Sequence, residues 1–522
     1  MKSLPIPRPG RREKTSLVSF ISPKKVIFSA LWALYLSLFL GLFSGVGIGI
    51  ADNGDGVRVT SPAGLNPQTE TGLTRGQGYV VTEFVSAANK SPASVFDRVT
   101  SLHYPTANAY VLTLMGVLSP DRTVSLFALG WLYLVVGLSI IWLAPLNRIF
   151  LPTVISMGVF TLAPFARWAT STYADTPAFL GFAAVLMSIV ALLGRLTSGE
   201  FLRVNVLLWW GVLLIALSKV AYAVAIPLIV AAYFLVVFVF QRAALTKSQL
   251  FPVAGVTVAG VALVSGMLAV QFGSSDREQS NIINNHHFVM SVVVPNYPAD
   301  IVEQSVPEPI RELAPEGYWP RTEDWRDVPG WEETMTDTAL ITELRLALFT
   351  QPALLYELMS QAVASSTTPE LDYLVPNTWL PDEAPPISVL PMGLYVATTG
   401  LVHFLLYPLS IPGLAIPLVI AVAIAALGVL VFRPGGRRGN ESGESSKLLA
   451  LTVLSCLFAG ALAGAAILGD GLSDQAAIGF TEFMKHLIMT SFLFTIFIVS
   501  ALVLAGRRIF LRVRKGINSR KR

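Results

Sequence analysis

The sequence places two carboxylates and an arginine close together in the segment Asp52-Asn53-Gly54-Asp55-Gly56-Val57-Arg58. A long apolar run ends directly before them, so a helix end would hold all three charges at a membrane surface. The two glycines permit a tight turn with positive φ, which would bring backbone and carboxylates close to a ligand. The alternative is a solvated turn, because Asp, Asn and Gly are the commonest turn residues.

Two further polar segments lie between apolar runs. His103 precedes an apolar stretch that ends near Leu118 and is too short to span a bilayer, which predicts a helix along the interface. Asp175 lies in the short turn Arg167–Pro177, and Pro177 then starts a helix. A carboxylate in that position is either the helix cap or a functional group, and the sequence leaves both interpretations open.

Ionisable residues are almost absent from the interiors of the apolar runs. Such a group inside hydrocarbon costs roughly 2.5–3.5 kcal/mol on insertion scales, so proton- and sodium-coupled transporters show buried Asp, Glu or Arg in mid-helix. Here the nearest case is Lys219, which falls at a predicted outer junction between two helices. Polar chemistry concentrated at one interface favours an enzyme that acts on a membrane lipid over a conduit.

The composition requires membrane-spanning helices to position these residues. The chain of 522 residues is 53% hydrophobic and only 13% charged, whereas soluble domains have roughly 25% charged residues. The predicted fold class is all-α, a polytopic transmembrane helical bundle with interfacial helices in its extracytoplasmic loops. Apolar runs of spanning length predict ten spans, near 26–50, 122–145, 149–166, 177–194, 204–218, 220–240, 251–271, 413–432, 448–469 and 484–506.

The distribution of basic residues orients this bundle. Seven Lys and Arg precede the first span and eight follow the last, so the positive-inside rule places both termini in the cytoplasm. The connection 272–390 carries 19 Asp and Glu against 5 Lys and Arg and is predicted outside. The weakly apolar segment Val389–Leu409 is then a re-entrant or interfacial helix, because a full crossing would invert the rule.

The predicted organisation has five parts: a basic cytoplasmic N-terminus, 1–25; an N-terminal transmembrane core, 26–271, with a first outer loop at 51–121; an extracytoplasmic loop or lid, 272–412; C-terminal transmembrane helices, 413–506; and a basic cytoplasmic tail, 507–522. The net charge of +4 comes from the basic ends and does not indicate a nucleic-acid partner. The single cysteine, Cys456, lies in an apolar run, so no intrachain disulfide forms.

The order of these segments resembles the GT-C superfamily, membrane glycosyltransferases that take a sugar from a polyprenyl phosphate on the outer face. The resemblance is best over 26–240 and is closest to bacterial hexose transferases of surface-glycan assembly. In the superfamily an essential acidic residue follows the first helix, in some branches as Asp-x-x-Arg, and Asp55 with Arg58 matches that spacing. His103-Tyr104-Pro105 resembles a His-Pro-Pro-rich helix start but lacks the second proline. Other polar positions of the superfamily are matched by Asp175, Lys219 and Glu482–His486.

The resemblance implies inverting transfer of a sugar from a polyprenyl-phosphate-linked donor to a cell-envelope glycan or lipid acceptor, at the outer face of a bacterial cell membrane. Asp55 is then the general base that deprotonates the acceptor hydroxyl, and Asp52 either replaces it or orients Arg58. The anionic leaving phosphate needs a cation at the interface. The residues expected to bind substrate are Arg58, His103, Asp175, Lys219, Lys485 and His486.

The sequence assigns no cofactor. Some superfamily members use a divalent cation through Asp-x-Asp-type carboxylates, and the oxygen ligands available here are Asp52, Asp55 and Asp175. The adjacent pair His286-His287 is a weak zinc signal, because neighbouring side chains rarely point the same way and no Cys or carboxylate cluster accompanies them. The metal ligands stay unassigned.

Three alternatives stay open: a polytopic glycan polymerase or ligase, a lipid or glycan transporter, and a membrane scaffold without enzymatic activity. A polymerase or ligase usually centres on Arg and His in large loops, which the five basic residues of 272–390 do not favour. Uncharged helix interiors do not favour the transporter.

Overall fold

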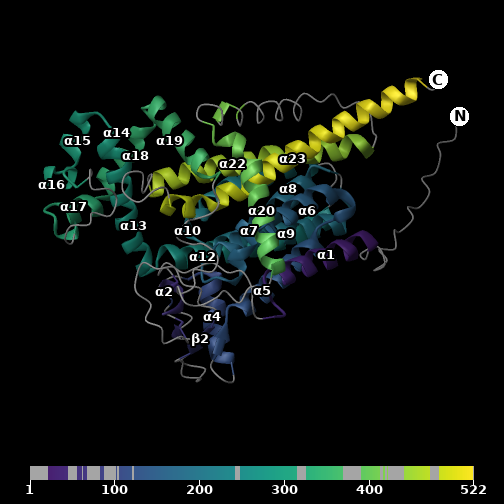
Figure 1. Ribbon diagram of the computed structural model, residues 1–522, viewed down its shortest axis with the longest axis horizontal. Helices are drawn as coiled ribbons and strands as arrows, with labels where there is room; N and C mark the ends of the chain where they lie inside the picture. Colours follow the sequence, from purple (N-terminus) through teal and green to yellow (C-terminus); the bar gives the residue numbers. More distant parts are fainter. Residues whose placement is uncertain are drawn as a thin grey trace.

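The chain folds mainly into helices in the computed structural model (Figure 1). The structure describes residues 22–44, 56–61, 63–67, 83–86, 102, 105–119, 123–194, 196–241, 247–313, 325–367, 389–411, 416–417, 420, 440–470 and 481–520. A bundle of long helices draws on both halves of the chain, and a group of short helices lies at one end of it.

The bundle consists of helices that follow the apolar runs of the sequence. Its elements are α1 (Pro23–Phe39), α5 (Phe127–Leu143), α6 (Leu146–Phe160), α7 (Ala163–Ala166), the 3-10 helix η2 (Arg167–Thr170), α8 (Thr176–Leu192), α9 (Ser198–Ala216), α10 (Val220–Ala223), α11 (Ala225–Val236), the π-helix η3 (Val237–Gln241), α12 (Lys247–Phe272), α20 (Val389–Leu406), the 3-10 helix η8 (Tyr407–Leu409), α22 (Asn440–Asp470) and α23 (Thr481–Arg520).

Five of the described helices are long and apolar enough to cross a membrane, or six if the pair Leu146–Phe160 and Ala163–Thr170, bent by 68°, is one span. α5 and α8 have 17 residues each, at the lower limit of about 17 residues for a crossing. The expected span at 413–432 lies mostly outside the described residues. The chain is therefore a multi-pass helical bundle, and the count of ten spans stays a prediction.

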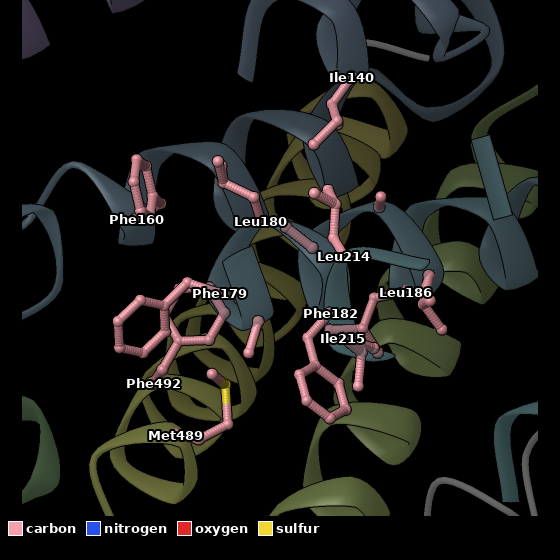
Figure 2. Packing of buried hydrophobic residues seen from close by; sticks show 14 of the residues in the cluster. Ile140, Phe160, Phe179, Leu180, Phe182, Leu186, Leu214, Ile215, Met489 and Phe492 are labelled. Carbon is pink, nitrogen blue, oxygen red and sulfur yellow. The ribbon is translucent and has the colours of Figure 1, made fainter. Parts of the chain in front are cut away.

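α8 is the centre of the bundle, and every residue of this helix is buried. It meets α9 where Gly181 and Gly211 face each other, since a Cβ added to either glycine would lie 2.7–2.8 Å from the carbonyl oxygen of the other. Small residues allow two helix backbones to approach this closely in a membrane. Phe179 of α8 also contacts Phe492 of α23, with ring centroids 5.1 Å apart (Figure 2). This packing fixes the start of α8, where Asp175 lies.

A small layer of strands and short helices follows α1. Its elements are α2 (Val57–Thr60), β1 (Leu65–Pro67), β2 (Glu83–Ser86), α4 (Ala107–Leu118) and β3 (Thr123–Ser125). The strands form an antiparallel sheet in the order β1-β2-β3, with Leu65 opposite Ser86 and Phe84 opposite Val124. α4 is the short apolar helix that the sequence predicts, and its Gly116 packs on Ser86. The sheet was not predicted, because strands of three or four residues are too short for alternation to show.

The connections of the bundle gather at two opposite ends. One end joins the start of α1, the α5–α6 and α8–α9 connections and the start of α22. Its contacts are Lys25 Nζ to the Trp142 and Ala144 carbonyls, Arg148 to Glu200, Lys447 Nζ to the Arg148 carbonyl, and Arg507 to Glu444. The opposite end of the bundle is named here the α4 end. It contains α4, the turn before α8, the α9–α10 junction and the end of α12. This alternation matches the predicted one; the side of the membrane that each end faces stays a prediction.

The group of short helices between α12 and α20 is named here the α13–α19 body. It comprises α13 (Ser275–Phe288), the π-helix η4 (Val289–Val293), α14 (Val294–Asn296), α15 (Ala299–Ser305), α16 (Glu308–Arg311), the 3-10 helix η6 (Trp325–Asp327), α17 (Trp331–Thr336), α18 (Thr338–Leu348) and α19 (Pro352–Ser365). Its apolar core includes Phe288 and Trp331 and continues into Ala463 of α22 and Leu487 of α23. Figure 1 shows the body on the side opposite to the Pro23 end of α1 and the C-terminal end of α23.

α20 corresponds to the weakly apolar segment before the last helices. It packs against α7, α23 and α1 and runs across α23 in Figure 1. Its interpretation as a re-entrant or interfacial helix stays a prediction.

A neutral histidine is built into the α13–α19 body. The buried His286 accepts a hydrogen bond at Nδ1 from the Trp331 Nε1, at 3.0 Å. Burial, and secondly the neighbouring His287, lowers the pKa of His286 to about 3. The accepted hydrogen bond and the lowered pKa both require the uncharged ring.

Acidification should therefore loosen this body. Because the folded pKa of His286 lies below its ordinary value of 6.5, the unfolded chain takes up this proton first, and stability falls as the pH drops from about 6.5 toward 3, by up to about 1.4 kcal/mol per pH unit. We expect His286→Gln, which retains an acceptor for Trp331, to flatten this dependence in hydrogen exchange of α13 and α17. His403→Gln, outside the body, is the control, and an unchanged slope in the His286 variant would contradict the assignment.

Candidate functional site

An ion pair joins two of the residues that the sequence singles out. The Lys219 Nζ lies 2.8 Å from the Asp175 Oδ2, with the Asp175 side chain fully buried and 15% of the Lys219 side chain exposed. Tyr222 donates a hydrogen bond to the other carboxylate oxygen, Oδ1. Lys219 and Tyr222 are three residues apart at the start of α10, so their side chains lie on one face and reach the same carboxylate.

Asp175 does not cap its helix. It occupies the N-cap position of α8, but its backbone is helical, with φ −85° and ψ −33°, and its side chain makes no capping hydrogen bond. A capping residue normally has extended dihedrals and accepts from an amide of the first turn. The capping interpretation is therefore wrong, and the carboxylate is directed to Lys219 and Tyr222 instead.

The junction that carries Lys219 is held by the end of α12. Lys219 has extended dihedrals, φ −63° and ψ 138°, between α9 and α10. Gln271 donates from Nε2 to the Ser218 carbonyl at 3.0 Å and to the Pro105 carbonyl at 3.2 Å. Helix ends leave carbonyls without intrahelical partners. The Gln271 amide supplies a partner for the Ser218 carbonyl and also connects this junction to the segment before α4.

One buried side chain holds the turn before α8. Asn108, in the first turn of α4, donates from Nδ2 to the three carbonyls of residues 171–173, at 3.2, 3.3 and 2.7 Å. Its Oδ1 accepts a hydrogen bond from the Tyr133 hydroxyl of α5. α4 therefore connects the first loop to the turn that ends in Asp175.

Aromatic rings surround the ammonium group. The Lys219 Nζ lies 5.8 Å from the centroid of the Trp168 ring and 5.7 Å from that of Tyr173, both within the range of a cation–π interaction. The two rings meet edge to face at 5.2 Å, and the Trp168 Nε1 donates to the Pro164 carbonyl at 2.9 Å. These rings exclude water from one side of the ion pair.

A second buried cation precedes this aromatic pair. Arg167 is fully buried and donates from one terminal nitrogen, Nη1, to the Tyr395 hydroxyl of α20 at 3.3 Å. The contact brings α20 to the same region as η2. The sequence gives no local sign of it, because the two residues are far apart in the chain.

Several buried polar atoms around the ion pair lack hydrogen-bond partners among the described residues. They are the Asp175 Oδ2, the Thr176 Oγ1, the Lys219 Nζ and the Gln271 Oε1. The contact between Lys219 and Asp175 is thus an ion pair without hydrogen-bond alignment. Since Asp175 and Lys219 are each other's ion-pair partners, the Thr176 Oγ1 and the Gln271 Oε1 are the buried atoms beside them that are left to a water or a polar ligand.

The remaining predicted site residues, or their side chains, lie outside the part of the chain that the structure describes. Asp52, Asp55 and His103 lie outside the described residues, and the structure describes the backbone but not the side chains of Arg58, Lys485 and His486. Arg58 lies in α2, which packs on α4, and Lys485 and His486 lie in the first turns of α23. Sequence reasoning missed Asn108, Tyr133, Tyr222 and Gln271, whose partners are all distant in the chain.

The described residues contain no group of three or more His, Cys, Asp or Glu that could hold a metal ion. Asp175 therefore belongs to no such group, and its charged neighbour is the Lys219 ammonium. The proposed partners Asp52 and Asp55 lie outside that part of the chain.

Removing one member of a buried ion pair leaves an uncompensated charge, at a cost of about 3–5 kcal/mol. We expect Asp175→Asn and Lys219→Met each to lower the free energy of unfolding by about this amount, and the double variant to lose less than the sum. Tyr222→Phe removes one hydrogen bond and should cost only about 1–3 kcal/mol. Denaturant unfolding in detergent measures all four variants, and strictly additive effects would show that the pair is not coupled.

Residues 11–366 match the family model described as the YfdI N-terminal transmembrane domain. The matched range includes the first loop, Asp175, Lys219 and the α13–α19 body. Searches of curated proteins and of solved structures found no significant match.

Proposed function

Because most of its length matches the YfdI N-terminal transmembrane domain, the chain belongs to that family of polytopic membrane proteins, and we propose that it is a glycosyltransferase of the GT-C type. The proposed reaction moves a sugar from a polyprenyl-phosphate-linked donor to a glycan or lipid acceptor of the cell envelope. The proposed location is a bacterial cell membrane, with both termini cytoplasmic and the reaction at the outer face.

The observation that carries this proposal is the buried Asp175–Lys219 pair with its unpartnered polar neighbours at the α4 end. No Asp, Glu, Lys or Arg occurs in several helices of the bundle, namely α5, α8, α11 and residues 251–272 of α12. A lipid head group lies at one depth of the membrane, so an enzyme acting on it needs polar groups at that depth. A coupled transporter needs them in mid-helix.

Lys219 is the proposed contact for the phosphate of the donor. An ammonium group makes strong charge-assisted hydrogen bonds with phosphate oxygens, and the surrounding aromatic rings keep the local dielectric low, which strengthens them. Asp175 balances the charge of Lys219, and the Lys219 ammonium group, which has three N–H donors, retains donors for the incoming phosphate.

Asp55 is the proposed base, with Asp52 as its substitute. The acceptor hydroxyl attacks the anomeric carbon opposite the phosphate and passes its proton to the carboxylate. The bond from the anomeric carbon to the phosphate oxygen breaks, and the polyprenyl phosphate leaves with the electron pair. Support comes from α2, which follows Asp55 and packs on α4, the same helix that holds the turn of Asp175 through Asn108.

The remaining proposed substrate contacts are Arg58, His103, Lys485 and His486. Lys485 and His486 precede Leu487, which belongs to the core of the α13–α19 body. Their backbone therefore lies at the start of α23 where that body docks. A divalent cation held through Asp52 and Asp55 stays part of the proposal.

The test is sugar transfer by the purified protein in vesicles with polyprenyl-phosphate hexoses as donors. Loss of a general base typically slows a reaction by about 10²- to 10⁴-fold, so we expect Asp55→Ala to reduce the rate constant by such a factor while the protein still inserts and accumulates. Lys219→Met should weaken donor use as well.

The matched control is Asp327→Ala, which removes an exposed carboxylate of the α13–α19 body and should leave transfer unchanged. Full activity of Asp55→Ala would remove the base assignment. Transfer by none of the donors, in a protein that remains folded, would contradict the glycosyltransferase.

A further inference from the structure

The last part of α23 extends beyond the bundle. A helix of 40 residues is about 60 Å long, whereas the hydrocarbon core of a bilayer is only about 30 Å thick. The ion pair of Arg507 with Glu444 ties α23 to α22. The following residues, 508–520, are named here the C-terminal extension, and Figure 1 shows this yellow end of α23 running outward past the neighbouring helices.

The C-terminal extension has an apolar stripe with exposed arginines around it. Ile509, Phe510, Val513 and Ile517 are each more than half exposed, and their spacing of three and four residues places them on one side of the helix. Arg508, Arg512 and Arg514 are exposed as well, and helical geometry places Arg508 opposite the stripe and Arg512 and Arg514 along its two edges.

The apolar stripe continues a surface that is already exposed inside the bundle. Leu502, in the spanning part of α23, is 58% exposed, and Ile509 and Val513 follow it at seven and eleven residues, on the same side. In the membrane that side of Leu502 contacts lipid. An apolar stripe beside clustered arginines is the pattern of a helix that enters the boundary between head groups and acyl chains of an anionic membrane.

A second copy of the chain fits this stripe less well than a lipid surface does. Two extensions packed stripe against stripe would bring the flanking Arg512 and Arg514 side chains of both copies close together, and like charges at close range repel. Anionic lipid phosphates instead complement the arginines and accept their bidentate hydrogen bonds. We propose that the C-terminal extension binds the surface of an anionic bilayer, with its apolar stripe in the lipid boundary and its arginines on lipid phosphates.

The test uses the full chain with Cys456→Ala and Ile517→Cys, labelled with a polarity-sensitive dye. The protein is reconstituted in vesicles of phosphatidylcholine alone or with phosphatidylglycerol added. We expect the anionic lipid to shift the emission to the blue and to reduce quenching by acrylamide. Raising the salt from about 0.1 M to about 1 M should reverse both effects, because the screening length falls from about 10 Å to about 3 Å.

Two combined variants separate the contribution of the arginines from that of the apolar stripe. Combined Arg508→Gln, Arg512→Gln and Arg514→Gln should abolish the difference between the two lipid compositions, and Phe510→Gln with Val513→Gln should abolish the blue shift. The same dye at Thr336→Cys, an exposed site of the α13–α19 body, is the control and should not respond. Equal emission in both lipid compositions would overturn the proposal, and so would efficient disulfide cross-linking of two chains through the Ile517→Cys position.

Discussion

Charge is costly inside hydrocarbon, and this cost sorts the polar residues of the chain into two ends with different properties. At one end, polar side chains satisfy helix carbonyls: Lys25 Nζ donates to the carbonyls at the end of α5, and Gln241 donates to the Leu192 and Gly194 carbonyls at the end of α8. These contacts hold the helices together. At the α4 end, Asp175 and Lys219 neutralise each other but leave polar atoms without partners. At the α4 end, the unpartnered atoms among the described residues are the Thr176 Oγ1 and the Gln271 Oε1 beside the ion pair.

Hydropathy made the helices of the bundle predictable. The runs near 122–145, 177–194 and 251–271 coincide closely with α5, α8 and α12, because about 20 apolar residues leave few alternatives to a helix in a membrane.

The candidate site was predictable only in part. Lys219 is conspicuous as a lone charge between two apolar runs, but Tyr222 and Gln271 have ordinary residue types and act through long-range contacts. The local capping rule failed at Asp175 because an ammonium from another helix competes better for the carboxylate than the amides of α8 do.

The core of the bundle contains residues from inside the range that matches the family model and residues from the C-terminal helices that follow it. That range ends at residue 366, whereas the rings packed on α8 include Phe458 and Phe492 of α22 and α23. The Ser491 hydroxyl donates to the Ser366 carbonyl, so the last residue of the range is itself bonded to α23. The transmembrane domain of this chain therefore depends on helices on both sides of that boundary.

Gln271 links parts of the molecule that the chain keeps far apart. Its amide holds the backbone beside Lys219 and the segment before α4, and only Gly273 and Ser274 separate the end of α12 from α13. The α13–α19 body is therefore joined to the bundle within three residues of the side chain that holds the lysine junction.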